Sequence, residues 1–183
     1  TLKPFLQYFK LKNKTDYLKY IEENEKEISS LEKLLSTFIH LFKANNFALE
    51  DFIKFKKEAL LTFSLKNYRR EKFLLTLAVT IYLKYADYLE ENEEIDFDDM
   101  LIKAKRHVDK YGVFHKIKYV IIDEYQDTSL VRFDLVKSIL DKTGASLIAV
   151  GDDFQSIYRF TGCDLSLFLD FKKIFRDGKI LKI

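Results

Sequence analysis

Two short apolar runs that each end in acidic residues constrain the fold of this chain most strongly. Residues 119–122 read Tyr-Val-Ile-Ile and lead directly into Asp123 and Glu124. Residues 146–150 read Ser-Leu-Ile-Ala-Val and lead into Gly-Asp-Asp at 151–153. Such runs are typical of strands buried on both faces of a parallel sheet. The sequence therefore predicts a sheet whose carboxyl edge carries acidic side chains.

Helical patterns alternate with these two runs. One face of the segment between them carries Leu130, Phe133, Val136, Ile139 and Leu140, with Thr128 or Ser129 as its cap. A further helix is expected after Asp164, and residues 180–183 are expected to begin a third strand. This alternation of strand and helix predicts an open α/β sheet.

The first half of the chain has a different pattern, because all five glycines lie after residue 111. Long helices with polar connections are therefore expected there. Apolar residues recur at helical spacing over 31–42 and 73–89, and Ser29 with Glu32 forms a predicted capping box. Further helices are expected between Leu49 and Leu61 and from Asp96 onward. We divide the chain into a helical region at 1–94 and an α/β region at 95–183.

Composition excludes several classes of protein. The chain is 48% hydrophobic and 33% charged, which indicates a folded protein without a membrane span. Its single cysteine, Cys163, cannot form an internal disulfide, and this fits a reducing cytoplasm. Three isolated histidines offer no zinc cluster. The net charge of +2 leaves any nucleic-acid binding to local patches.

The two adjacent carboxylates at the end of the first run need compensation, since Asp123 and Glu124 would repel each other. A Mg²⁺ ion with nucleotide phosphates is one solution, because Mg²⁺ binds carboxylate and phosphate oxygens. Asp123 would then hold the ion and Glu124 would take a proton from the attacking water. The alternative is a solvated strand end at which Asp127 or Thr128 caps the next helix.

Longer motifs surround this pair. Residues 120–129 (Val-Ile-Ile-Asp-Glu-Tyr-Gln-Asp-Thr-Ser) resemble motif II of the superfamily 1 DNA helicases related to UvrD and Rep. Residues 151–162 (Gly-Asp-Asp-Phe-Gln-Ser-Ile-Tyr-Arg-Phe-Thr-Gly) resemble motif III of the same enzymes, and residues 95–101 resemble the acidic-aromatic element that precedes motif II. Residues 158–164 lean toward the helicase IV branch.

The resemblance implies ATP and Mg²⁺ as cofactors and assigns roles to single residues. It implies that Asp123 binds the metal ion and that Glu124 is the general base. It also implies that Gln155 contacts the γ-phosphate and the attacking water. It places Tyr158 and Phe160 against single-stranded DNA, although ordinary core packing is the alternative for both rings. Many relatives carry arginine where this chain has Thr161.

The resemblance also implies which part of a helicase this chain represents. No Gly-x-x-x-x-Gly-Lys-[Ser/Thr] phosphate loop occurs in the sequence, and Met100 is its sole methionine. We therefore expect an internal fragment: an all-helical 1B-type subdomain followed by the distal part of a RecA-like P-loop NTPase motor domain. The whole enzyme would couple ATP hydrolysis to 3′–5′ translocation and to unwinding of DNA. The fragment alone should be inactive, and its partners would be single-stranded DNA, a duplex junction and the rest of the helicase, with no membrane.

A basic patch and an acidic run lie in or beside the helical region. Seven lysines and arginines fall between Lys54 and Lys72, and Arg69 and Arg70 are the candidates for DNA phosphate contacts. A solvated helix face without a partner is the alternative. Eight acidic residues between 87 and 99 are expected to form a hydrated connector.

Two other function classes stay open at this stage. The chain could be a non-catalytic helical interaction module with a degenerate NTPase remnant. A metal-dependent nuclease built on Asp123, Glu124 and Asp152 ranks last, because it does not explain Gln155 or the run at 126–128.

Overall fold

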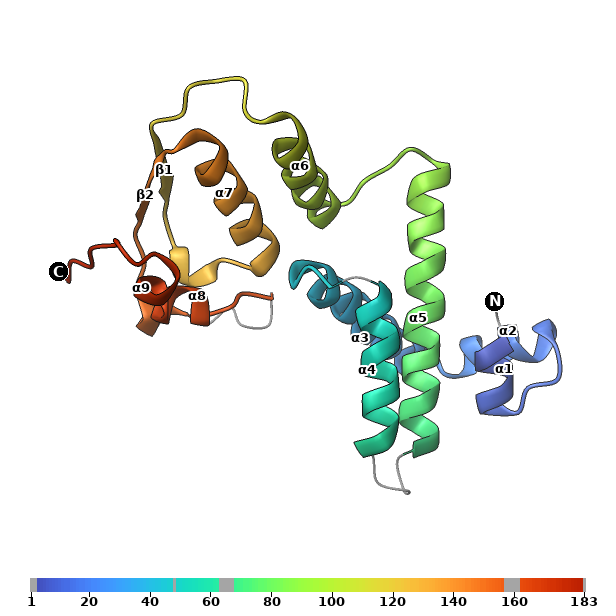
Figure 1. Cartoon of the computed structure of the whole chain (residues 1–183). Coiled ribbons are helices and arrows are strands. Elements are labelled where there is room, and N and C mark those ends of the chain that lie inside the picture. Colours follow the sequence, from blue (N-terminus) through green and yellow to red (C-terminus); the bar gives the residue numbers. More distant parts are fainter. Residues whose placement is uncertain (1–2, 48, 63–67, 157–161, 183) are drawn as a thin grey trace. The chain divides into compact units, whose positions relative to one another are not determined.

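The computed structural model describes residues 3–47, 49–62, 68–156 and 162–182, and the chain divides into two compact units (Figure 1). The first unit is Thr1–Ile39 with Phe47–Ile95. The second is His40–Asn46 with Asp96–Ile183. In the described part of the chain, no helix is sufficiently long and apolar to cross a membrane.

The first unit is helical and has an aromatic core. Its helices are α1 (Lys3–Phe9), α2 (Lys14–Glu23), most of α3 (Glu25–Ala44), α4 (Leu49–Thr62) and α5 (Tyr68–Glu91). The ring of Phe5 is buried and meets the ring of Tyr17 edge-on, with centroids 5.1 Å apart. Phe52 of α4, only 1% exposed, meets Phe38 of α3 at 5.2 Å. The predicted helix between Leu49 and Leu61 is confirmed.

The helix ends correct two sequence predictions. Helix α3 begins at Glu25, so Ser29 lies inside it and the predicted capping box is wrong. The neighbouring Ser30 hydroxyl donates instead to the Lys26 carbonyl at 2.9 Å. Helix α5 continues to Glu91 and α6 begins at Phe97, so only the middle of the acidic run, residues 92–96, is a connector. Asp96 caps α6 (Phe97–Tyr111) as predicted, because its side chain accepts from the Asp99 amide at 2.8 Å.

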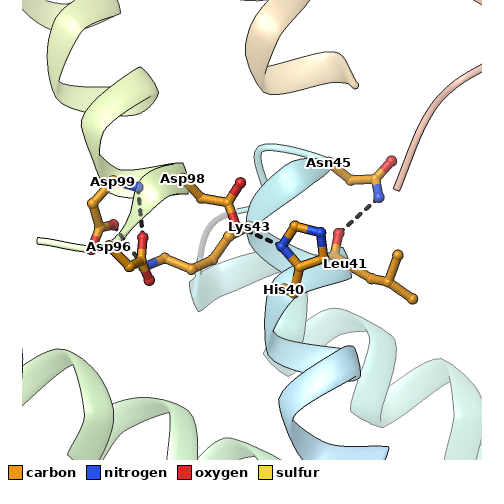
Figure 2. A network of polar contacts seen from close by, with 7 residues as sticks. All are labelled: His40, Leu41, Lys43, Asn45, Asp96, Asp98 and Asp99. Carbon is orange, nitrogen blue, oxygen red and sulfur yellow. Dashed lines mark hydrogen bonds and ion pairs between the residues drawn. The ribbon is translucent and has the colours of Figure 1, made fainter. Parts of the chain in front are cut away.

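The C-terminal end of α3 belongs to the second unit, where ion pairs attach it to the first turn of α6 (Figure 2). The Lys43 ammonium lies 2.6 Å from Asp96 Oδ2 and 2.7 Å from Asp99 Oδ1. His40 Nδ1 lies 2.9 Å from Asp98 Oδ2. Burial alone would lower the pKa of Lys43, but hydrogen bonds and charge from the two aspartates outweigh it and raise that pKa.

The second unit contains a two-stranded parallel sheet with helices. Strand β1 (Tyr119–Ile122) pairs with β2 (Ser146–Ala149), Tyr119 opposite Ser146 and Ile122 opposite Ala149. Helix α7 (Leu130–Thr143) connects the strands, as a parallel pair requires. Short elements follow each strand: η1 (Tyr125–Asp127) after β1, and η2 (Asp153–Gln155), α8 (Ser166–Leu169) and α9 (Phe171–Ile174) after β2. The predicted α/β organisation with a parallel sheet is confirmed.

One face of this small sheet is covered and the other is exposed. Ile122 and Ala149 pack against a buried cluster of Tyr125, Phe133 and Leu167. Tyr119 and Ile121 are 63% and 70% exposed. The prediction of strands buried on both faces is therefore wrong, because exposed residues alternate with half-buried ones along each strand.

The predicted third strand is also wrong over the described residues 180–182. The sheet contains β1 and β2, and this segment joins neither of them. Leu181 is 90% exposed there. An apolar run forms a strand only when it has a neighbour with which to exchange backbone hydrogen bonds.

Candidate functional site at the carboxyl ends of the strands

Backbone hydrogen bonds bring the segments after β1 and β2 together. The Val150 amide donates to the Ile122 carbonyl at 2.8 Å, and the Tyr125 amide donates to the Val150 carbonyl at 2.9 Å. Pairing thus continues beyond the last residue of each strand. The acidic residues after β1 and the loop that starts at Gly151 therefore lie at one edge of the sheet.

Asp123 and Glu124 form a tight turn at this edge. Asp123 is exposed, and its Oδ1 accepts from the Glu124 amide at 2.9 Å. Glu124, also exposed, adopts the left-handed conformation, with φ of 50° and ψ of 45°. A non-glycine residue in that region is uncommon and costs on the order of 1–3 kcal/mol. Such strained residues concentrate at functional sites. Here the strained turn separates two exposed carboxylates from the buried residues that follow.

Tyr125 anchors this turn in the core. It is 2% exposed, and its ring meets Phe171 edge-on at 5.9 Å. Burial raises the pKa of the Tyr125 phenol to about 12, so the group stays neutral. Its hydroxyl oxygen is buried and has no hydrogen-bond partner in the described structure. Tyr125 is thus a structural residue that fixes its exposed neighbours.

The Gln126 side chain links the two strand ends. It is 1% exposed, its Nε2 donates to Glu124 Oε2 at 2.6 Å, and its Oε1 accepts from the Asp152 amide at 3.0 Å. One amide group therefore connects the carboxylate after β1 to the backbone after β2. Sequence reasoning missed this role, although Gln126 lies in the run at 126–128 that the nuclease hypothesis left unexplained.

Asp152 extends the connection to Gln155. Asp152 Oδ1 accepts from the Phe154 amide at 3.0 Å, and its Oδ2 accepts from Gln155 Nε2 at 2.8 Å. Hydrogen bonds therefore join Glu124 to Gln126, Gln126 to the Asp152 backbone, and the Asp152 side chain to Gln155. Through these residues the structure links Glu124 and Gln155, which the sequence had placed in separate motifs.

The segment after Gln126 packs into the unit and does not cap α7. The N-cap of α7 is Ser129, without a side-chain capping bond, so neither Asp127 nor Thr128 has that role. The Asp127 carbonyl accepts from Cys163 Sγ at 2.9 Å, and the Thr128 carbonyl accepts from the Asp164 amide at 3.0 Å. The predicted cap at 127 or 128 is therefore wrong, whereas Asp123 and Glu124 are exposed at the strand end, as that alternative expected.

The carboxylates at this edge fit a Mg²⁺–nucleotide complex better than a metal cage made of protein alone. Across the described residues, no three His, Cys, Asp or Glu side chains are placed to hold a metal ion. A Mg²⁺ ion bound with a nucleotide needs fewer protein ligands, since one or two carboxylates, phosphate oxygens and water complete its coordination shell. Exposed Asp123 suits that arrangement. The nuclease hypothesis gains no support, because Asp123, Glu124 and Asp152 do not form such a group of three in the described structure.

The predicted DNA-binding residues are only partly described. Tyr158, Phe160 and Thr161 lie outside the described residues. Arg69 and Arg70 are exposed in the first turn of α5, in the first unit. That end of α5 lies beside the C-terminal end of α4 (Figure 1).

Comparison with known proteins identifies the family. A family profile described as the UvrD/REP helicase N-terminal domain matches residues 2–176. The chain belongs to this family. The resemblance drawn from residues 120–129 and 151–162 is thereby confirmed.

Individual UvrD/REP relatives match over part of their length. The ATP-dependent DNA helicase PcrA of Bacillus subtilis is 35% identical over 106 residues, which is 55% of this chain and 14% of PcrA. The ATP-dependent DNA helicase Rep of Buchnera aphidicola is 32% identical over 136 residues, 64% of this chain and 21% of Rep. The chain thus matches about a fifth or less of each relative.

Proposed function

We propose that this chain supplies the Mg²⁺-binding and water-activating part of an ATP-dependent DNA helicase. The observation that carries the proposal is the hydrogen-bonded series from Glu124 to Gln155 at the carboxyl edge of the sheet. Membership of the UvrD/REP family supports it. The two relatives compared above are both named ATP-dependent DNA helicases.

Asp123 and Glu124 have different tasks in this proposal. Asp123 would hold Mg²⁺, because its exposed carboxylate offers oxygen ligands. The bound ion would neutralise charge on the nucleotide phosphates. Glu124 takes the proton of the attacking water, and its fixed backbone keeps its carboxylate at the solvent edge. The two carboxylates accept hydrogen bonds from different donors, Asp123 from the Glu124 amide and Glu124 from Gln126 Nε2, and this difference suits two separate tasks.

Gln155 and the residues after it connect the nucleotide to DNA. An exposed amide can donate to a γ-phosphate oxygen and accept from water, so Gln155 suits the sensing of phosphate. Tyr158 and Phe160 follow directly in the sequence and are proposed to face single-stranded DNA. Stacking of a ring on a base contributes about 1–3 kcal/mol and tolerates any sequence, as a translocating motor requires.

The helical region has a proposed role at the duplex. We assign residues 1–94 to a 1B-type subdomain and 95–183 to the distal part of the first RecA-like motor domain. Exposed Arg69 and Arg70 would contact phosphates near a duplex junction. Translocation in the 3′–5′ direction is proposed from the family alone.

We propose that this chain is part of a longer, complete protein. Measuring ATP hydrolysis by that complete protein tests the proposed function. Hydrolysis is expected to rise when single-stranded DNA is added. The 183-residue chain alone is expected to hydrolyse no ATP, because it has no phosphate loop to hold the β- and γ-phosphates. Hydrolysis by the isolated chain, or a complete protein without DNA-stimulated hydrolysis, would contradict the proposal.

A further inference from the structure

Gln126 has a side chain that suits a bridge between two segments. A carboxamide is planar and carries a donor and an acceptor on one carbon, so each half can serve a different partner. In this structure Nε2 donates a hydrogen bond to Glu124 at 2.6 Å, and Oε1 accepts one from the Asp152 backbone amide at 3.0 Å. Asparagine has the same group on a side chain that is one methylene shorter.

Burial makes this bridge restrictive. Gln126 is 1% exposed, so water is not at hand to replace either hydrogen bond. If the buried amide lost one partner, it would leave an unpaired polar group, which costs free energy. Breaking either hydrogen bond is therefore unfavourable. The donor faces a carboxylate, and charge-assisted bonds of this kind are short and strong.

Gly151 provides the room for the bridge. A Cβ at this position would overlap Gln126 Oε1 and would lie 3.0 Å from Phe168 Cε2 and 3.1 Å from the Tyr125 amide nitrogen. The requirement is steric, since Gly151 is not among the glycines with positive φ. The backbone after β2 can approach the Gln126 amide only because it carries no side chain here.

We propose that Gln126 is a positioning residue that orients the Glu124 carboxylate and couples it to the loop at 151–155. This inference rests on the proposed function, in which Glu124 takes a proton from water. The hydrogen bond from Gln126 Nε2 to Glu124 Oε2 restricts the orientation of the carboxylate, and Oε1 would accept the proton of the attacking water. A movement of the loop at 151–155 would shift the Asp152 amide, and the two hydrogen bonds of Gln126 would pass this shift to the Glu124 carboxylate.

Steady-state ATP hydrolysis by variants of the complete protein, with single-stranded DNA present, tests this role. Gln126→Met keeps the length of the side chain and removes both hydrogen bonds. We expect its kcat to fall about 10–100-fold, the range typical of residues that orient a catalytic ligand, with KM for ATP little changed. Gln126→Glu keeps the acceptor for Asp152 and places a carboxylate against Glu124, so its kcat should fall at least as far.

A control separates positioning from general loss of stability. Ser138 is also buried, at 6% exposure, and its hydroxyl donates to Asp109 between α7 and α6. Ser138→Ala should lower the melting temperature and leave kcat unchanged. If Gln126→Met does not fold, Gln126→Asn replaces it, and the same loss of kcat is expected because the shorter amide cannot span both partners.

The outcomes distinguish this inference from the proposed function. A large fall in kcat for the Gln126 variants, at melting temperatures matching Ser138→Ala, supports the positioning role. Gln126 variants that turn over like wild type, while Glu124→Gln is inactive, overturn the inference alone. If Glu124→Gln also turns over like wild type, the proposed function fails and the inference fails with it. The inference is also overturned if kcat of the Gln126 variants falls no further than kcat of Ser138→Ala.

Discussion

Glu124→Gln in the complete protein is expected to lower ATP turnover by about 10²-fold or more, the scale of a lost general base. Glutamine has the size of glutamate, and its carbonyl oxygen can still accept the hydrogen bond from Gln126 Nε2. The fold and the binding of ATP and DNA should therefore be retained. Single-turnover hydrolysis with bound ATP measures the chemical step directly.

Glu94→Gln is the matched control for this prediction. Glu94 offers the same chemical change at an exposed position in the acidic connector, in the first unit. Its turnover should equal that of the wild type. A Glu124→Gln protein with turnover near wild type would show that Glu124 is not the base.

Gly151→Ala is expected to have the largest effect on stability, a loss of about 2–5 kcal/mol in the free energy of unfolding. The added methyl group would overlap Gln126 Oε1, which cannot swing aside without breaking two buried hydrogen bonds. Urea denaturation of the 183-residue chain, followed by circular dichroism, gives this free energy.

Gly144→Ala separates steric overlap from backbone strain. Gly144 ends α7 with φ of 67°, and a Cβ there would meet no atom within 4 Å. Its cost should be that of a left-handed alanine alone, about 1–2 kcal/mol. Equal losses for the two variants would contradict the close approach of Gln126 to Gly151.

The local pattern of the sequence predicted the elements that build the site. Periodicity identified β1, β2 and the helix between them, because alternating strand and helix signals are local properties. The parallel order then placed Asp123 and the loop after β2 at one edge, as the structure shows. The cap at Asp96 was readable for the same reason, since a capping residue acts on its own helix turn.

Features that depend on contacts distant in sequence were not predictable. Ile121 belongs to an apolar run, yet its exposure depends on which elements cover each face of the sheet. The bridge made by Gln126 depends on Asp152, which lies 26 positions away. Nothing in the sequence indicates that the Gln126 amide is buried or which residue it contacts. Ser29 matched a capping pattern, but α3 begins four residues earlier, at Glu25. Tertiary contacts decide the exposure of Ile121 and the bridge of Gln126, which local preference does not specify.

The measurement that tests the central claim most directly is equilibrium binding of ATP to the complete protein, with and without Mg²⁺, in the wild type and Asp123→Ala. If the strand-end carboxylates form the Mg²⁺–nucleotide site, the wild type should bind ATP more tightly with Mg²⁺ than without it. Asp123→Ala should lose most of this difference and still bind DNA. An Asp123→Ala protein with the full Mg²⁺ dependence of the wild type would contradict the account.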